Sequence, residues 1–209
     1  SIVVENNDVE GKICYEIKGR DFLKNGVQTF IWSSFYRRNL LVKEQLRFSN
    51  LTIGEDILFN LNVYLKNPTI RSVSSRIYMY DLHEESTIHQ RNFQAIHKAI
   101  QSYLILIQSI KEHITKNNDN IELCQGLQNS MEGQFVPFIS RVLSSNYSIG
   151  EFRLLKETLL KKNILPLTNY TKYSIIINIL FKFPILIKFY QFIYRNIFLS
   201  FIFPHLSRN

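Results

Sequence analysis

The chain has 209 residues, 45% of them hydrophobic, which is enough to build a sizeable core in one domain or in a domain with an appendage. Seven Gly and five Pro exclude a collagen-like or linker-like composition. The formal net charge of +8 is compatible with nucleic acid, anionic lipid or a phosphorylated substrate. We expect no nucleic-acid partner, because the C-terminal basic residues punctuate an aromatic and aliphatic segment, and no helix-turn-helix, RNP or zinc pattern is present.

Short strands and helices are predicted in residues 1–90. Residues 2–5 and 12–17 are β-like runs joined by Asn, Asp and Gly residues that favour a turn, so they predict a hairpin. Residues 56–65 predict a helix, because apolar side chains recur at intervals of three and four. The other elements expected here are a short helix over 19–26 with Phe22 and Leu23 inward, an extended segment followed by a helix over 29–41 carrying Phe35, Tyr36, Leu40 and Leu41 on one side, and a strand over 71–80.

From residue 92 the apolar period becomes helical, and three helices are expected to pack as a bundle. The first spans 92–116, and the second spans 121–143 with an interruption or kink at Pro137. The third begins at Ser148, where Glu151 completes a capping box, and it is stopped by Asn163 and Pro166. The stripe of the first helix consists of Phe93, Ile96, Ile100, Tyr103, Leu104, Ile107, Ile110 and Ile114.

Residues 170–204 are crowded with Ile, Leu, Phe and Tyr but are interrupted by Lys182, Lys188 and Arg195. No charge-free run approaches the roughly 18 residues that a membrane span needs. Pro184 predicts two helices, each mixing aromatic residues with cationic ones that snorkel to phosphates. We favour a segment that lies on an anionic membrane surface; the alternative is that it packs on the bundle as ordinary core.

Two further features concern the setting of the chain. Cys14 and Cys124 are the only cysteines and nothing forces them to pair, so a reduced, cytoplasmic setting is expected. The first four residues, Ser-Ile-Val-Val, have the composition of the middle of a strand, with no initiator Met or signal peptide, which indicates a fragment.

The order of residues between positions 19 and 88 carries the strongest functional signal. An adjacent acidic pair, Glu55 and Asp56, follows Gly54 and precedes an apolar turn, which aims a carboxylate at a cleft. Around the pair stand, in chain order, Trp32, Phe35, Tyr36, Arg37, Arg38, Leu41, Phe48, Phe59, Tyr78, Tyr80, Ser86 and Ile88. Together they resemble the C-terminal half of the catalytic domain of family 2 (GT-A type) glycosyltransferases, which build bacterial polysaccharides.

The resemblance implies an α/β fold class, with the C-terminal remnant of a GT-A, Rossmann-like domain followed by a mainly α-helical appendage. Residues 1–90 would be the acceptor-side half of the GT-A domain. Residues 91–165 would form the helical bundle region. Residues 166–209 would form aromatic and basic amphipathic helices at a membrane interface.

The resemblance also implies roles for the acidic pair and the residues before it. Asp56 corresponds to the general base, and Glu55 to a neighbour that binds or orients the acceptor. Without the resemblance, such a pair opening a helix is an N-terminal charge that favours the helix dipole. Trp32 either stacks on a pyranose ring or anchors the following helix in the core. Arg37 and Arg38 either bind a diphosphate or cover the surface, and at least one is expected at the surface.

The resemblance also concerns two residues after the expected strand and a metal ion. His83 is either a metal ligand or a solvated loop residue, and Ser86 stands where the family shows a serine, so its hydroxyl is a candidate contact to phosphate. The complete enzyme is expected to use Mg²⁺ or Mn²⁺ held by an Asp-x-Asp, which this sequence lacks. The acidic run of Asp8, Val9 and Glu10 lies in the predicted hairpin turn and is rejected as a metal site. The acceptor side is therefore expected to be present and the nucleotide-binding half to be missing.

The function expected from the resemblance is inverting transfer of sugar from a nucleotide-sugar donor to a saccharide or lipid-linked acceptor, in cell-surface polysaccharide synthesis. The isolated chain is expected to be inactive. The setting would be the cytoplasm, peripheral to the inner face of the cell membrane. An alternative is a non-catalytic, membrane-peripheral interaction protein derived from such an enzyme, in which the helix that begins at the acidic pair is structural.

Overall fold

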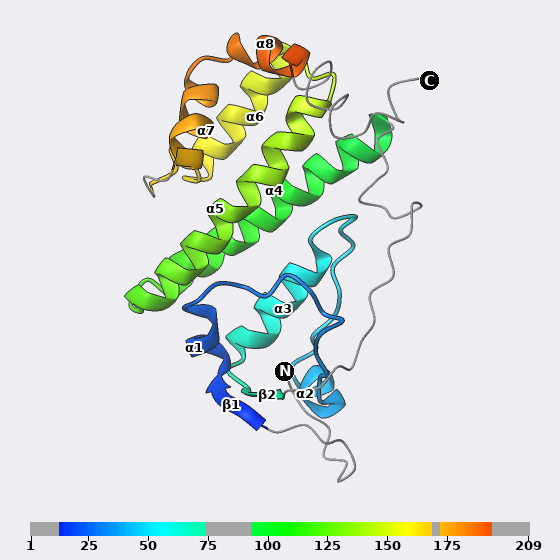
Figure 1. Cartoon of the computed structure of the whole chain (residues 1–209), viewed down its shortest axis with the longest axis vertical. Helices are drawn as coiled ribbons and strands as arrows, with labels where there is room; N and C mark the ends of the chain where they lie inside the picture. The colour runs from blue at the N-terminus through cyan, green and yellow to red at the C-terminus, as the bar shows by residue number, and fades with distance from the viewer. Residues whose placement is uncertain (1–12, 74–92, 169–171, 194–209) are drawn as a thin grey trace. The chain divides into compact units, whose positions relative to one another are not determined.

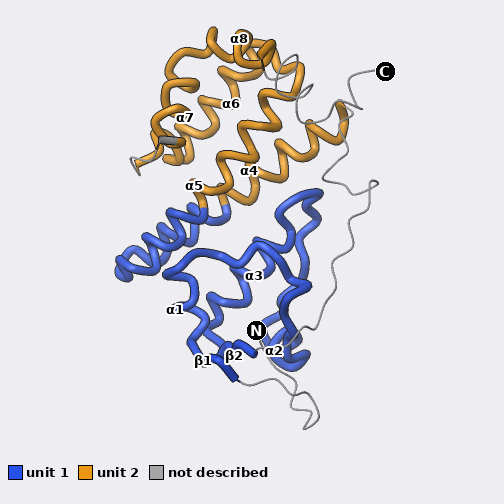
Figure 2. The backbone as a smooth tube through the Cα atoms, in the orientation of Figure 1, with its two compact units in different colours: residues 1–89, 109–130 blue, residues 90–108, 131–209 orange. Residues whose placement is uncertain are grey.

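The computed structural model describes residues 13–73, 93–168 and 172–193, which fold into two compact units (Figures 1 and 2). Most of these residues are helical, and the described strands form one two-stranded antiparallel sheet. Helices and strands are both present, as the α/β class predicts, but helices dominate. The described residues contain no parallel strand pair of a Rossmann-like sheet.

The sheet in unit 1 joins two segments that are distant in sequence. Strand β1 (Ile13–Lys18) pairs antiparallel with β2 (Thr69–Val73), with Ile17 opposite Ile70. The predicted hairpin partner of β1, residues 2–5, lies outside the described residues. Among the described residues, β1 therefore pairs with a strand that is distant in sequence, and the pairing brings the two ends of the intervening segment together.

Along the chain, three helices follow β1 and precede β2. Helix α1 (Gly19–Leu23) follows β1 directly, and Leu23 is fully buried, as predicted. Helix α2 (Arg38–Lys43) begins later than expected, so Phe35 and Tyr36 precede it instead of lying on it. Helix α3 (Glu55–Leu65) is the central element of the unit, and its buried residues are Ile57, Leu58, Phe59, Asn60, Leu61, Val63 and Tyr64.

Two long helices follow, α4 (Phe93–Lys116) and α5 (Ile121–Ser144). The predicted stripe of α4 is buried except at Phe93, which is exposed, and at Ile114, which is half-buried. Helix α5 continues through Pro137 without interruption. Residues 109–130 belong to unit 1 and the rest of both helices to unit 2, which differs from the expected boundary between a domain ending at residue 90 and a separate bundle.

Helix α6 (Ile149–Lys161) begins at the predicted capping box. The backbone amide of Glu151 donates to Ser148 Oγ at 3.1 Å, and the backbone amide of Ser148 donates to Glu151 Oε2 at 2.7 Å. The helix ends before Asn163, whose φ of 54° is left-handed. The predicted start and end of this helix are therefore both confirmed. Each depends on residues within one helical turn, which the sequence shows directly.

Pro184 separates α7 (Lys172–Lys182) from α8 (Leu186–Ile193), as predicted. Both helices belong to unit 2 together with the bundle residues. The ring of Phe181 stacks on Phe152 of α6, with centroids 4.8 Å apart. Within the described ranges, no helix combines the length and the apolar character that a bilayer span requires.

Candidate functional site

The site is built around the first turn of α3. Gly54 precedes the helix with a φ of 82°, a left-handed conformation that glycine adopts without a Cβ penalty. Glu55 and Asp56 then occupy the first turn, and both are half-buried. The prediction that the acidic pair opens a helix is therefore correct at the level of local structure.

A buried amide holds residues 27–36 against α3. Asn60 is fully buried, and its Nδ2 donates to the backbone carbonyls of Gln28 at 3.0 Å and Phe30 at 3.3 Å. Its Oδ1 accepts the hydroxyl hydrogen of Tyr36. The hydroxyl of Tyr64 donates to Gln28 Oε1 at 2.7 Å. Because Asn60 lies four residues after Asp56, these bonds bring the preceding loop to the side of α3 that carries the carboxylate.

Asp56 contacts this loop directly. Burial raises the pKa of Asp56 above its ordinary value, and a hydrogen bond from the backbone amide of Ile31 opposes part of the rise. Burial also raises the pKa of Tyr36, and the charge of Asp56 adds to that rise. In the described part of the chain, Asp56 forms no ion pair. A carboxylate of raised pKa without a cationic partner is suited to accept a proton.

Glu55 shares the partly desolvated environment. Burial raises its pKa, and the neighbouring negative charge of Asp56 raises it further. No ion pair of the described residues includes Glu55. Asp56 differs from Glu55 in that its carboxylate accepts a hydrogen bond from the backbone amide of Ile31 in the loop.

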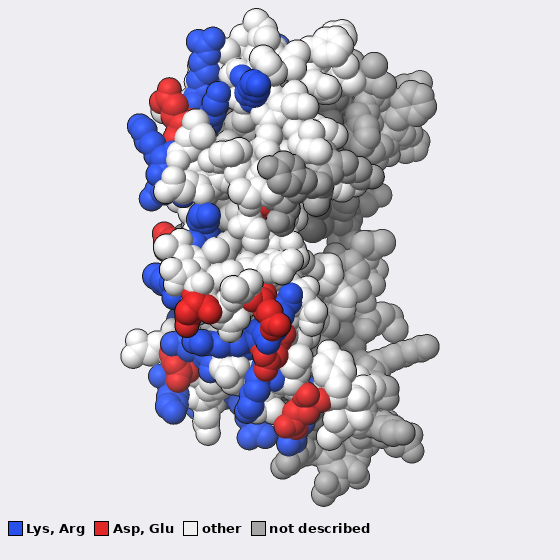
Figure 3. Space-filling model, turned by 90° about the vertical axis from the view of Figure 1, so that its left-hand side faces the viewer, with Lys and Arg blue, Asp and Glu red and all other residues white. Residues whose placement is uncertain are grey.

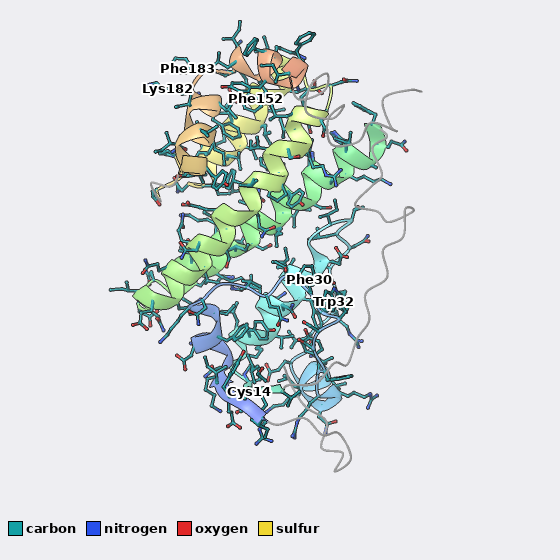
Figure 4. The ribbon with its side chains drawn as sticks, viewed as in Figure 1. Cys14, Phe30, Trp32, Phe152, Lys182 and Phe183 are labelled. Atoms are coloured by element: carbon teal, nitrogen blue, oxygen red, sulfur yellow. The ribbon has the colours of Figure 1, made fainter. Side chains whose placement is uncertain are left out.

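The same loop presents an exposed aromatic pair (Figure 4). Trp32 is 37% exposed and Phe30 is 52% exposed, and their ring centroids lie 5.0 Å apart. This exposure favours a surface role for Trp32 over the alternative of a core anchor. A second aromatic contact fixes the neighbourhood, because Phe48 stacks on Phe59 of α3 with centroids 4.2 Å apart while remaining exposed.

Four further site residues were predicted, of which the structure describes two. Arg37 and Arg38 are both exposed, and neither forms an ion pair within the described ranges. His83 and Ser86 lie outside the described residues. Among the residues that are described, no group of three or more His, Cys, Asp and Glu side chains is placed to hold a metal ion. Cys14 and Cys124 do not form a disulfide with each other.

The residues that position the loop, above all Asn60 and Gln28, were not among the predicted site residues. One signal was available: Asn60 stands within the apolar stripe of a helix, and a buried amide needs hydrogen-bond partners. The partners themselves were not predictable from spacing, because Gln28 and Phe30 lie about one helix and one loop earlier in the chain.

Replacing Asn60 with Leu is expected to destabilise the protein by about 1–3 kcal/mol, because it leaves the carbonyls of Gln28 and Phe30 without their donor. Urea denaturation measures the change. Asn62→Leu is the matched control, since the Asn62 side chain is half-buried on the same helix and makes no hydrogen bond with described residues. Equal stability of the two variants would contradict the anchoring role of Asn60.

Comparison of the chain with protein-family models, with curated proteins and with solved structures found no match.

Proposed function

We propose that this chain carries the acceptor side of a sugar transferase of the family 2, GT-A type, with Asp56 as the general base. The observation that supports the proposal is that a half-buried Asp56, without an ionic partner in the described part of the chain, hydrogen-bonds the loop that presents Phe30 and Trp32. A base must lie beside the surface that holds the acceptor, and exposed aromatic rings stack on the apolar face of a pyranose.

In the proposed reaction, an acceptor hydroxyl of a saccharide or lipid-linked sugar attacks the anomeric carbon of a nucleotide sugar. The hydroxyl proton passes to the Asp56 carboxylate, and the nucleoside diphosphate leaves with inversion at the anomeric carbon. Glu55 is proposed to orient the acceptor. The described residues offer no ligand set for the divalent metal expected with such a donor, so the proposal rests on Asp56 and the acceptor surface alone.

The acceptor surface is testable on the chain itself, because Trp32 is its only tryptophan. Titration with mono- and oligosaccharides should change the emission of Trp32 in a saturable way as a sugar ring covers the indole. Phe30→Ala is expected to weaken the binding roughly two- to tenfold by removing the adjacent ring. Phe93→Ala, at an exposed aromatic residue on α4, is the matched control and should leave the titration unchanged.

If acrylamide quenches the fluorescence of Trp32 but no saccharide changes it, the proposal of an acceptor surface at Trp32 is contradicted. In that case the second candidate function, a non-catalytic interaction protein at the inner face of the membrane, is favoured. The observation in its support is the large exposed apolar area on α7 and α8.

A further inference from the structure

Helix α8 buries Ile187 and Gln191 and exposes Phe189, Tyr190 and Phe192. Gln191 is buried, and its Nε2 donates to the backbone carbonyls of Val142 at 3.2 Å and Tyr147 at 3.3 Å. Lys188 Nζ donates to the same Tyr147 carbonyl at 2.8 Å. The exposed fractions are 60% for Phe189 and 65% for Phe192 on α8, and 71% for Ile185 just before the helix. A helix made for contact with water exposes polar side chains instead of large apolar ones.

Helix α7 is apolar on both sides. Ile177, Leu180 and Phe181 are buried in unit 2. The opposite side carries exposed apolar residues at helical spacing, which are Ile175, Ile176, Ile179 and, just after the helix, Phe183. We call these four residues, together with Ile185, Phe189 and Phe192 of the α8 side, the outer apolar face.

Lysines border the outer apolar face, and one of them, Lys188, also interacts electrostatically with Glu151 of α6. Lys182 and Lys188 are exposed, and Lys182 Nζ lies 5.5 Å from the Phe183 ring centroid (Figure 4). No Asp or Glu follows Glu157 in the sequence, whereas seven Lys and Arg do: Lys161, Lys162, Lys172, Lys182, Lys188, Arg195 and Arg208. These seven charges nearly equal the net charge of +8, so the preceding residues are almost neutral.

In the upper part of the face that Figure 3 shows, uncharged residues predominate, and Lys and Arg side chains stand at the edge together with Asp or Glu surface. An apolar face bordered by lysines complements the boundary between lipid headgroups and acyl chains.

We propose that the outer apolar face binds an anionic membrane surface, with α7 and α8 lying in the plane of the interface. Their lengths of 11 and 8 residues are far below the roughly 20 that a span requires, so the helices insert their outer side chains without crossing. A second copy of the chain is a poorer occupant, because it would bring another cationic face against this one with no carboxylate from residues 158–209 to pair with it.

The test is co-sedimentation of the full chain with phosphatidylcholine vesicles, with and without phosphatidylglycerol, at low and high salt. We expect binding to the anionic vesicles that weakens at high salt. The double variant Ile179→Ser, Phe189→Ser should weaken partitioning by about tenfold or more, because two exposed apolar side chains no longer insert. Lys182→Gln should weaken it by about fivefold at low salt.

Ile121→Ser is the control, since Ile121 is 78% exposed, more than Ile179 at 45% and Phe189 at 60%, but lies at the start of α5. It should bind vesicles as the unaltered chain does, and so should Asp56→Asn, which separates this inference from sugar transfer. Thermal melts by circular dichroism establish that the variants remain folded. Three outcomes would overturn the proposal: no vesicle binding by the full chain, binding that the double variant retains, or a dimer that the double variant dissociates without any lipid affinity.

Discussion

Asp56→Asn is expected to lower sugar transfer by about 10² or more, which is the usual scale for the loss of a general base. Asparagine has nearly the same shape and keeps an oxygen for the backbone amide of Ile31, so the loop contact survives while the proton acceptor is lost. The measurement is nucleoside diphosphate release from nucleotide sugars by the polypeptide as encoded, including any segment that precedes Ser1. Residues 1–209 alone are expected to show no turnover, because they contain no Asp-x-Asp to hold the metal of the donor diphosphate.

The pH profile provides a second readout of Asp56. Burial raises the pKa of Asp56 above that of an ordinary Asp. The carboxylate, which is the base form, is therefore present above this raised pKa and is lost as the pH falls through it. The acid limb of kcat/KM should therefore lie at a higher pH than for an exposed Asp, and Asp56→Asn should abolish that limb.

The same raised pKa predicts the effect of Asp56→Asn on stability. The folded state binds the Asp56 proton more tightly than the unfolded chain does, so the charged carboxylate lowers stability at neutral pH. Asp56→Asn should leave the melting temperature unchanged or slightly higher. Asp119→Asn, at an exposed carboxylate between α4 and α5, is the matched control for activity. Full transfer activity in Asp56→Asn would remove Asp56 from the mechanism.

Gly126→Ala is expected to destabilise the protein by roughly 3 kcal/mol, because helix α5 touches the end of α1 at this glycine. A Cβ on Gly126 would lie 2.1 Å from the carbonyl oxygen of Leu23 and 2.6 Å from that of Lys24. These are backbone atoms, so relief requires α1 and α5 to separate. Separation would also strain the bond from the Val27 amide to Ser130 Oγ, which is 2.9 Å long.

Gly133→Ala is the matched control for the same substitution on the same helix. Nothing lies within 4 Å of the Cβ that alanine would add there. Alanine should therefore stabilise the helix by about 0.5–1 kcal/mol, through its lower backbone entropy in the unfolded chain. Urea denaturation of both variants gives the two free energies of unfolding. Changes of the same sign would show that α5 does not depend on close contact at Gly126.

The sequence by itself determined the elements whose signals are local. The apolar stripe of α4, the capping box at Ser148 and the break at Pro184 each act within a few turns of chain, and all three appear at the predicted places. The first turn of α3 was predictable for the same reason, since Gly54 and the apolar residues after Asp56 define where the helix begins.

Only the tertiary structure decided which distant segments meet. Strand β1 pairs with β2, although α1, α2 and α3 separate them in sequence. No residue pattern in β1 predicts that partner. The loop carrying Trp32 lies on α3 because the buried Asn60 bonds to two of its carbonyls. The side of α8 that faces the protein was likewise decided by packing. The sequence does not show that Gln191 is buried while Phe189 is exposed. Such contacts depend on long-range chain closure, which local spacing does not encode.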